Sequence, residues 1–222
     1  MKKRIEMGMK TFAIVPVKRF ENAKTRLSSI LDTDDRVRLS LLMLEDTLQI
    51  LSVVHRLSRV ITVSADKRVE EIAAKYGAKF LLEEKERGVN SAVALANRYC
   101  MKKEAADATM VIPHDLPLLD STDISKVCEL AENECRCVVI CPSIRYDGTN
   151  LLLRKPPSII ATFYDADSYN MHVKAAIQLG IPIKHLFSRA LMHDIDTPED
   201  AFEIIKEETV TARSLEFIKS KF

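Results

Sequence analysis

Short runs of apolar residues alternate along the chain with longer segments in which the apolar positions recur at helical spacing. The short runs have the length of buried β-strands and cover residues 11–17, 59–64, 79–82, 108–113 and 137–141. The longer segments predict amphipathic helices over residues 37–51, 67–76, 89–101 and 123–132. Strands that alternate with such helices are typical of a parallel sheet with crossover helices. The pattern therefore predicts an α/β fold with a mostly parallel central sheet.

The alternation is less regular after residue 141. An Asp-Gly pair within residues 145–150 (RYDGTN) predicts a tight turn, and residues 151–153 are expected to form a strand that pairs with the sheet edge. The remaining predicted elements are a helix over 168–179, short strands over 182–186 and 190–195, and a last helix that begins at Thr197, ahead of Pro198. We interpret residues 11–222 as one domain with an inserted β/α excursion around residues 145–195, and residues 1–10 as a flexible N-terminal extension.

The first predicted strand runs into a dense cluster of cations within residues 12–27 (FAIVPVKRFENAKTRL). Lys18, Arg19, Lys24 and Arg26 are opposed there by Glu21 alone, whereas the whole chain has a net charge of only +1. The segment contains no glycine, so it matches neither the dinucleotide fingerprint nor the GxxxxGK[ST] phosphate loop. We expect it to bind a polyphosphate through side-chain charge; the alternative is an ordinary solvated turn.

Composition excludes several classes of function. The near balance of 33 basic and 32 acidic residues provides no strongly basic face for nucleic acid. No apolar stretch approaches the ~18 residues that a membrane span needs. The five cysteines lie in apolar contexts and are odd in number, which predicts buried, reduced thiols and a cytoplasmic location. Cys135, Cys137 and Cys141 lack the paired spacing of a metal site.

Asp115 follows the predicted strand that ends near Pro113, within VIPHDLPLL. Ligands of open parallel sheets bind beyond the carboxyl ends of the strands. A carboxylate in that position suits Mg²⁺, which prefers oxygen ligands and usually retains substrate phosphates as partners. The alternative is that Asp115 only caps the turn between strand and helix.

Asp194 and Asp196 form a second acidic pair within MHDIDTPEDA, directly before the helix predicted at Thr197. Glu199 and Asp200 already provide the negative charge that stabilises the N-terminal end of that helix, so Asp194 and Asp196 are not needed for this purpose. We expect Asp115 with Asp196, or with Asp194, to hold one Mg²⁺ opposite the basic segment. Such a site would favour nucleotidyl transfer, which depends mainly on positioning and charge neutralisation and needs no covalent protein nucleophile.

Four motifs in this order, PVKRFENAKTRL, HDLPLL, DGTNLLL and DIDTPEDA, resemble those of the CofC family, the 2-phospho-L-lactate guanylyltransferases of coenzyme F420 biosynthesis. The resemblance extends from residue 11 to about residue 206. It implies a three-layer, Rossmann-like (GT-A-like) nucleotidyltransferase that uses Mg²⁺, GTP and a small phosphorylated acid. Open alternatives are another acid such as phosphoenolpyruvate or 3-phosphoglycerate, a sugar phosphate, or a non-catalytic nucleotide-binding module. A homodimer is expected.

The resemblance also implies roles for individual residues. Lys18, Lys24 and Arg26 would contact the triphosphate and act in catalysis together with Asp115, while Asp115 and Asp196 would ligate the metal, with Asp194 as a substitute. The nucleoside side would include Asp66, Gly88, Asn90 and Ser91, and the acceptor side Thr149, Asn150 and Ser168. The chain departs from the family pattern at Asp165, where relatives often carry glycine, and at His114, which we expect to be structural rather than a catalytic base, as we do His193.

Overall fold

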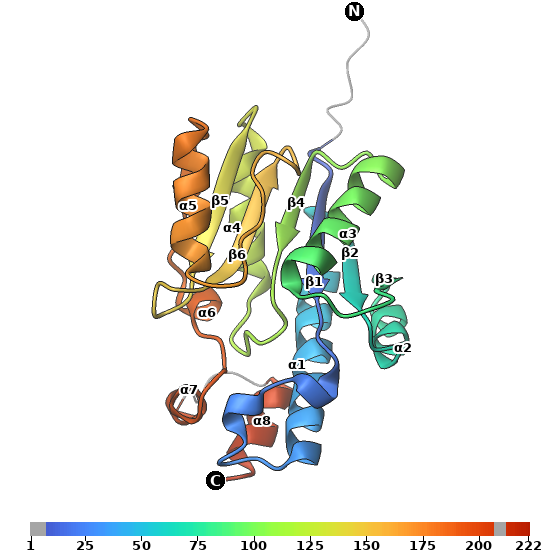
Figure 1. Cartoon of the computed structure of the whole chain (residues 1–222), viewed down its shortest axis with the longest axis vertical. Helices are drawn as coiled ribbons and strands as arrows, with labels where there is room; N and C mark the ends of the chain where they lie inside the picture. The colour runs from blue at the N-terminus through green and yellow to red at the C-terminus, as the bar shows by residue number, and fades with distance from the viewer. Residues whose placement is uncertain (1–7, 207–211) are drawn as a thin grey trace, which may run out of the picture.

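The computed structural model describes residues 8–206 and 212–222, so most of the predicted N-terminal extension lies outside it. A seven-stranded sheet in the order β3-β2-β1-β4-β6-β5-β7 forms the centre (Figure 1). All neighbouring strands are parallel except β6, which runs antiparallel to both β4 and β5. The strands are β1 (Thr11–Pro16), β2 (Leu57–Ser64), β3 (Lys79–Leu82), β4 (Ala108–Val111), β5 (Cys137–Pro142), β6 (Thr149–Lys155) and β7 (Ile183–His185).

Helices cover both faces of the sheet, which confirms the predicted layered α/β arrangement. On one face, Phe12 and Ile14 of β1 pack against α3, and β5 packs against α5. On the other face, Ala13 and Val15 pack toward α1, α2, α4 and α6. The helices are α1 (Thr33–Ser52), α2 (Arg68–Lys75), α3 (Val89–Lys103), α4 (Ser121–Glu132), α5 (Ser168–Gln178), α6 (Arg189–Met192), α7 (Pro198–Ile204) and α8 (Arg213–Lys219).

The order of the strands places a binding edge at the carboxyl ends of β1 and β4. The chain leaves β1 toward β2 on one side and later returns to β4 on the other, and ligands bind at such a switch point in open α/β sheets. Because β6 is antiparallel to β4, the beginning of β6 lies at the same edge, with Leu152 paired to Val111. Segments after β1, after β4 and before β6 therefore meet at this edge.

Some sequence-based predictions are wrong. Residues 151–153 do not pair with the sheet edge but belong to β6, which is buried between two strands. Residues 190–195 do not form a strand, because Ala190, Leu191 and Met192 continue a short helix and place Leu191 and Met192 against the core. Cys135 is exposed because it precedes β5, whereas all four other cysteines are buried, and all five are free thiols.

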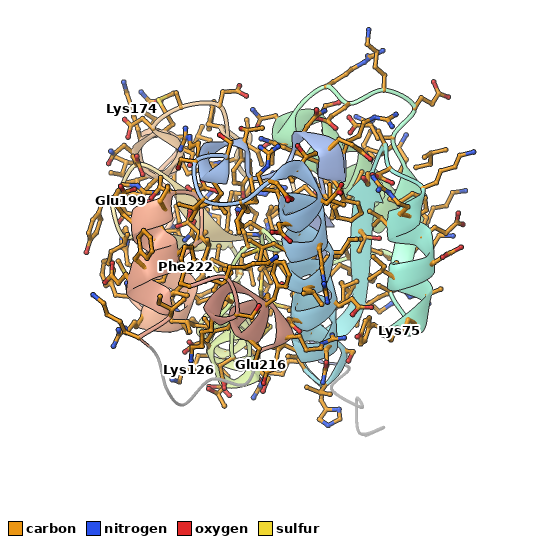
Figure 2. The ribbon with its side chains drawn as sticks, turned by 90° about the horizontal axis from the view of Figure 1, so that it is seen from below. Lys75, Lys126, Lys174, Glu199, Glu216 and Phe222 are labelled. Carbon is orange, nitrogen blue, oxygen red and sulfur yellow. The ribbon has the colours of Figure 1, made fainter. Side chains whose placement is uncertain are left out.

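The helix at Thr197 is not the last one. Helix α8 lies beside α1, as the view with Glu216 and Phe222 labelled shows (Figure 2). Its seven residues are fixed by tertiary contacts: Arg213 Nε donates to Asp46 Oδ1 at 3.1 Å, and the Ser214 amide donates to Asp46 Oδ2 at 2.9 Å. A short helix of this kind depends on packing more than on local propensity. Within the described residues, no helix has the length and apolar character needed to cross a bilayer.

A buried polar network connects α3 to β4 and β6. Asn97 Oδ1 accepts hydrogen bonds from Thr109 Oγ1 at 2.7 Å and from Arg154 Nη2 at 3.2 Å, and Asn97 Nδ2 donates to the Pro157 carbonyl at 3.1 Å. Arg154 is only 4% exposed, and burial lowers the pKa of its guanidinium. Asn97 therefore provides a hydrogen-bond acceptor for the buried guanidinium of Arg154.

We expect Asn97→Ala to lower the free energy of unfolding by about 2 kcal/mol, because it removes an acceptor from Arg154 and Thr109 and leaves buried donors unpaired. Urea denaturation followed by circular dichroism measures the change. Arg98→Ala, at the exposed neighbouring position of α3, is the matched control and should change stability little. Equal stability of the two variants would contradict the role of the network.

Candidate functional site

The basic segment after β1 is ordered by buried apolar residues. It forms two short 3₁₀ turns, Phe20–Asn22 and Thr25–Leu27, and both Phe20 and Leu27 are fully buried. These anchors leave Lys18 and Arg26 exposed at the binding edge. Lys24, between the two turns, has a φ of 53°, a left-handed conformation that is uncommon for residues other than glycine.

Lys24 joins the basic segment to both acidic motifs. Its Nζ lies 2.6 Å from Asp115 Oδ2 and 2.8 Å from Asp196 Oδ1, and its side chain is 5% exposed. The two acidic segments also contact each other through the backbone, since the Ile195 amide donates to the Asp115 carbonyl at 3.1 Å. Arg26 approaches Asp196 from the solvent side, with Nη1 at 3.9 Å from Oδ2. A simple solvated turn does not account for the burial of Lys24.

At this junction, burial and attraction between opposite charges act on the pKa values in opposite directions. Burial acts to lower the pKa of Lys24, but attraction to Asp115 and Asp196 outweighs it, so the pKa is raised and the ammonium persists. Lys24 in turn lowers the pKa of Asp196. Burial, together with repulsion from Asp115, raises the pKa of Asp194 to about 6. Asp196 therefore faces a cation, whereas Asp194 lies in a setting that disfavours its negative charge.

Asp194 and Asp196 thus have different surroundings although they are only two residues apart. Asn150 Nδ2 donates to Asp194 Oδ1 at 3.0 Å and to the Met192 carbonyl at 3.2 Å. Asn150, predicted to bind the acceptor, therefore acts here as a support for Asp194. Asp200 accepts from the Asp196 and Thr197 amides at 3.0 and 2.8 Å, which fixes Asp196 at the start of α7.

Two observations fit Asp115 and Asp196 to a divalent cation. Both carboxylates converge on one positive group, the Lys24 ammonium. In addition, Asp115 Oδ1 is buried and has no hydrogen-bond partner in the described part of the chain. Mg²⁺ is commonly held by one or two carboxylates plus substrate phosphates. Residues 8–206 and 212–222 contain no cluster of three or more His, Cys, Asp or Glu suited to a metal.

These groups line a cleft of about 400 Å³ at the carboxyl ends of β1 and β4. Its volume falls within the usual range for small-molecule sites. The predicted site residues in its lining are Lys18, Lys24, Arg26, Asp115, Thr149 and Asp196. The structure therefore brings together the cations of the first motif, a carboxylate from each acidic motif and the first residue of β6.

The residues predicted on the nucleoside side lie near the cleft but do not line it. Gly88 precedes α3 with a φ of 89°, a conformation that favours glycine, and the next residue, Val89, contributes to the lining. Asn90 Oδ1 accepts from the Tyr164 amide at 3.0 Å, and its Nδ2 donates to Asp165 Oδ2 at 3.0 Å. Asn90 thus holds the segment around Tyr164, and the unexpected Asp165 carboxylate has a partner.

Ser91 and Asp66 also lie outside the lining of the cleft. Asp66 accepts from the Phe20 amide at 3.3 Å and from Arg68 Nε at 2.9 Å, and Arg68 lowers the pKa of the Asp66 carboxyl. Asp66 therefore supports the basic segment through its hydrogen bond from the Phe20 amide. Direct contact of these two residues with a nucleoside stays a prediction.

Sequence reasoning missed several residues of the cleft, among them Asn22, Thr25 and Tyr164. Tyr164 Oη is buried without a hydrogen-bond partner in the described residues. The sequence could have indicated Tyr164, because it stands in FYDADSY directly before Asp165, which departs from the family pattern. His114 lines the cleft as well, but burial lowers its pKa to about 4, and its Nε2 lies 3.1 Å from Ser40 Oγ, so the neutral ring is part of the core contact with α1.

Comparison with known proteins agrees with this arrangement. The family model described as "Guanylyl transferase CofC like" matches residues 11–221. A phosphoenolpyruvate guanylyltransferase of Rubrobacter xylanophilus is 36% identical over 192 residues, 86% of this chain and 92% of the relative. A 2-phospho-L-lactate guanylyltransferase of Methanothermobacter thermautotrophicus is 36% identical over 197 residues, 89% of this chain and 85% of the relative.

The fold also resembles that of solved nucleotidyltransferases. A cytidylyltransferase of Leptospira borgpetersenii superposes with a TM-score of 0.61 at 15% identity, over 96% of this chain and 93% of that one. At that identity the likeness concerns the fold alone, and it agrees with the predicted three-layer, Rossmann-like arrangement. The match of the family model over nearly the whole chain, together with the two relatives, shows that this chain belongs to the CofC guanylyltransferase-like family.

Proposed function

We propose that this protein transfers GMP from GTP to 2-phospho-L-lactate with release of pyrophosphate, with Mg²⁺ as cofactor. The observation that carries the proposal is the convergence of Lys24, Asp115 and Asp196 in one cleft with the exposed cations Lys18 and Arg26. Family membership supports GTP as the donor.

In the proposed reaction, an oxygen of the acceptor's phosphate attacks the α-phosphorus of GTP. The new bond joins that oxygen to the α-phosphorus, and the bond from the α-phosphorus to the bridging oxygen of the β-phosphate breaks, so that pyrophosphate leaves with the electron pair. A phosphomonoester has its second pKa near ~6 and is already anionic at neutral pH, so no general base is required. The main barrier is repulsion between the two anionic substrates.

The residues of the cleft address that repulsion. Lys18 and Arg26 are exposed and would bind the outer phosphates, while Lys24 would turn from the carboxylates toward the triphosphate as the substrate arrives. Asp115 and Asp196 would hold Mg²⁺, which supplies positive charge against the phosphate oxygens when bound. Thr149 would face the acceptor, with Ser168 behind it, because Ser168 Oγ donates to Thr149 Oγ1 at 3.1 Å.

A second acceptor has specific support. The relatives named for phosphoenolpyruvate and for 2-phospho-L-lactate are equally similar to this chain, at 36% identity. Both acids carry a phosphate next to a carboxylate, so the same cations and hydroxyls suit either one. 3-Phosphoglycerate, a sugar phosphate and a non-catalytic nucleotide-binding role are the further alternatives. The last would need the basic segment but not Asp115 and Asp196. The homodimer and the cytoplasmic location stay predictions.

Incubation of the protein with each nucleoside triphosphate and each candidate acid, with and without Mg²⁺, tests the activity directly. We expect a guanylyl diphosphodiester of 2-phospho-L-lactate or phosphoenolpyruvate, read by mass spectrometry together with released pyrophosphate. Product from a sugar phosphate alone would contradict the proposed acceptor class. Binding of GTP without any product would favour the non-catalytic module.

Asp115→Asn should lower kcat by about 100-fold or more while changing GTP affinity only about threefold, because the charge of this carboxylate acts mainly on the reacting phosphates. Pyrophosphate release and fluorescence titration measure the two quantities. Glu199→Gln, an exposed acid in the first turn of α7, is the matched control and should retain full activity. Equal turnover of Asp115→Asn and the unmodified protein would remove the metal role.

Lys24→Met tests the charge balance without turnover. Removal of the ammonium leaves Asp115 and Asp196 facing each other, and we expect stability to fall by about 2 kcal/mol, less than for a fully buried pair because Asp196 is partly exposed. Millimolar MgCl₂ should then raise the Tm of Lys24→Met more than that of the unmodified protein. Lys18→Met, which changes an exposed cation of the same cleft, is the control. The same Mg²⁺ shift in all three proteins would contradict a shared cation site.

A further inference from the structure

His172 is a buried titratable group close to the cleft, and the reaction proposed above does not use it. It lies in α5 with no exposed surface and points toward the beginning of β6. Its Nδ1 is 3.0 Å from Thr149 Oγ1, and its Nε2 accepts a hydrogen bond from the Phe163 backbone amide at 2.9 Å. The Tyr164 ring packs against the imidazole in a T-shaped arrangement, with the centroids 5.0 Å apart. Both ring nitrogens of His172 therefore have partners.

The surroundings select one tautomer of His172. Burial, with the nearby Arg154 charge, lowers the pKa of His172 to about 4, so the ring is neutral and carries a single N–H hydrogen. A backbone amide can only donate, so Nε2 must be the acceptor for Phe163. The hydrogen is consequently on Nδ1, and Nδ1 donates to Thr149 Oγ1.

Thr149 Oγ1 then has its acceptor capacity filled. It receives hydrogen bonds from His172 Nδ1 and from Ser168 Oγ, the latter at 3.1 Å. A hydroxyl oxygen has two lone pairs and one hydrogen. With His172 and Ser168 as the donors to its two lone pairs, the hydrogen of Thr149 is left to point in a third direction, and Thr149 lines the cleft that contains Lys24 and Asp115.

We propose that His172 is a positioning residue that makes the Thr149 hydroxyl an obligate hydrogen-bond donor toward an anionic oxygen of the acceptor acid. The inference rests on the proposed function for the identity of that acid. Phosphate and carboxylate oxygens accept hydrogen bonds but do not donate them, so a hydroxyl that presented a lone pair would repel them. Since His172 also holds Phe163, the ring joins β6 to the segment that Asn90 holds on the other side.

Two substitutions separate the roles of the two ring nitrogens. In His172→Asn the side-chain amide nitrogen can occupy the position of Nδ1 and donate to Thr149, whereas His172→Gln places its carbonyl oxygen near Nε2 and retains only the acceptor for Phe163. We expect His172→Gln to raise the acceptor KM about tenfold, the cost of about one hydrogen bond, with the GTP KM unchanged. His172→Asn should keep the acceptor KM close to that of the unmodified protein.

A double-mutant cycle with Thr149→Val tests whether the effect passes through the hydroxyl. Thr149→Val should itself raise the acceptor KM, and His172→Gln should add little in that background. Equal loss in His172→Asn and His172→Gln, a change in the GTP KM, or additive effects in the double variant would overturn the proposal. Thermal melting of each variant checks that the fold is retained.

The tautomer can be read without catalysis. ¹⁵N NMR of the histidine side chains, with His172→Gln used for assignment, should show His172 protonated on Nδ1 and not on Nε2 near neutral pH. The opposite tautomer, or a charged ring, would overturn the proposal. If no acid is guanylylated at all, the proposed function fails, while the NMR result still decides whether His172 directs the Thr149 hydroxyl.

Discussion

One buried ammonium holds the binding edge of this protein together. Lys24 comes from the segment after β1, Asp115 from the segment after β4 and Asp196 from the segment before α7. The two short ion pairs of Lys24 bring these three distant parts of the sequence to one point. Like charges in a poorly hydrated place repel strongly, so the two carboxylates need a cation between them. Under the proposed function, the same need allows exchange, because a substrate-bound divalent cation would replace the positive charge that the lysine provides.

The architecture could be predicted from the sequence because a parallel sheet and its crossover helices leave a strong periodic signal. The position of β6 could not be predicted, because a strand buried on both faces has the same sequence pattern whether it lies inside a sheet or at its edge. The failure at residues 190–195 has a similar cause: Ala190 to Met192 are apolar in either conformation, and the short helix is selected by packing. Helix α8 is likewise fixed by Asp46 of α1, which no local pattern reveals.

The candidate site was predictable where charge density departs from the rest of the chain. The cations of the first segment and the acids at 115 and 196 stand out in sequence, and the structure places them together. The supporting residues were harder to assign. Asn90 and Asn150 are predicted to contact the substrates, which stays a prediction. In the structure their amides donate to Asp165 and Asp194, and these contacts exist only once α3 and β6 are packed in place.

The reversed direction of β6 places its first residue, Thr149, at the edge of the sheet where β4 ends. The cations of the basic segment and the carboxylates lie at the switch point of the sheet. The hairpin that leads into β6 is closed by the Ser143 amide bonded to the Gly148 carbonyl at 2.9 Å, and it ends at Thr149, which lines the same cleft. That hairpin also contacts the acidic segment, because the Ile144 amide donates to the Met192 carbonyl at 2.9 Å and Arg145 Nη1 donates to Asp200 Oδ1 at 2.9 Å. A change in the length of the hairpin would therefore displace Thr149 and, through Asp200, the support of Asp196 together.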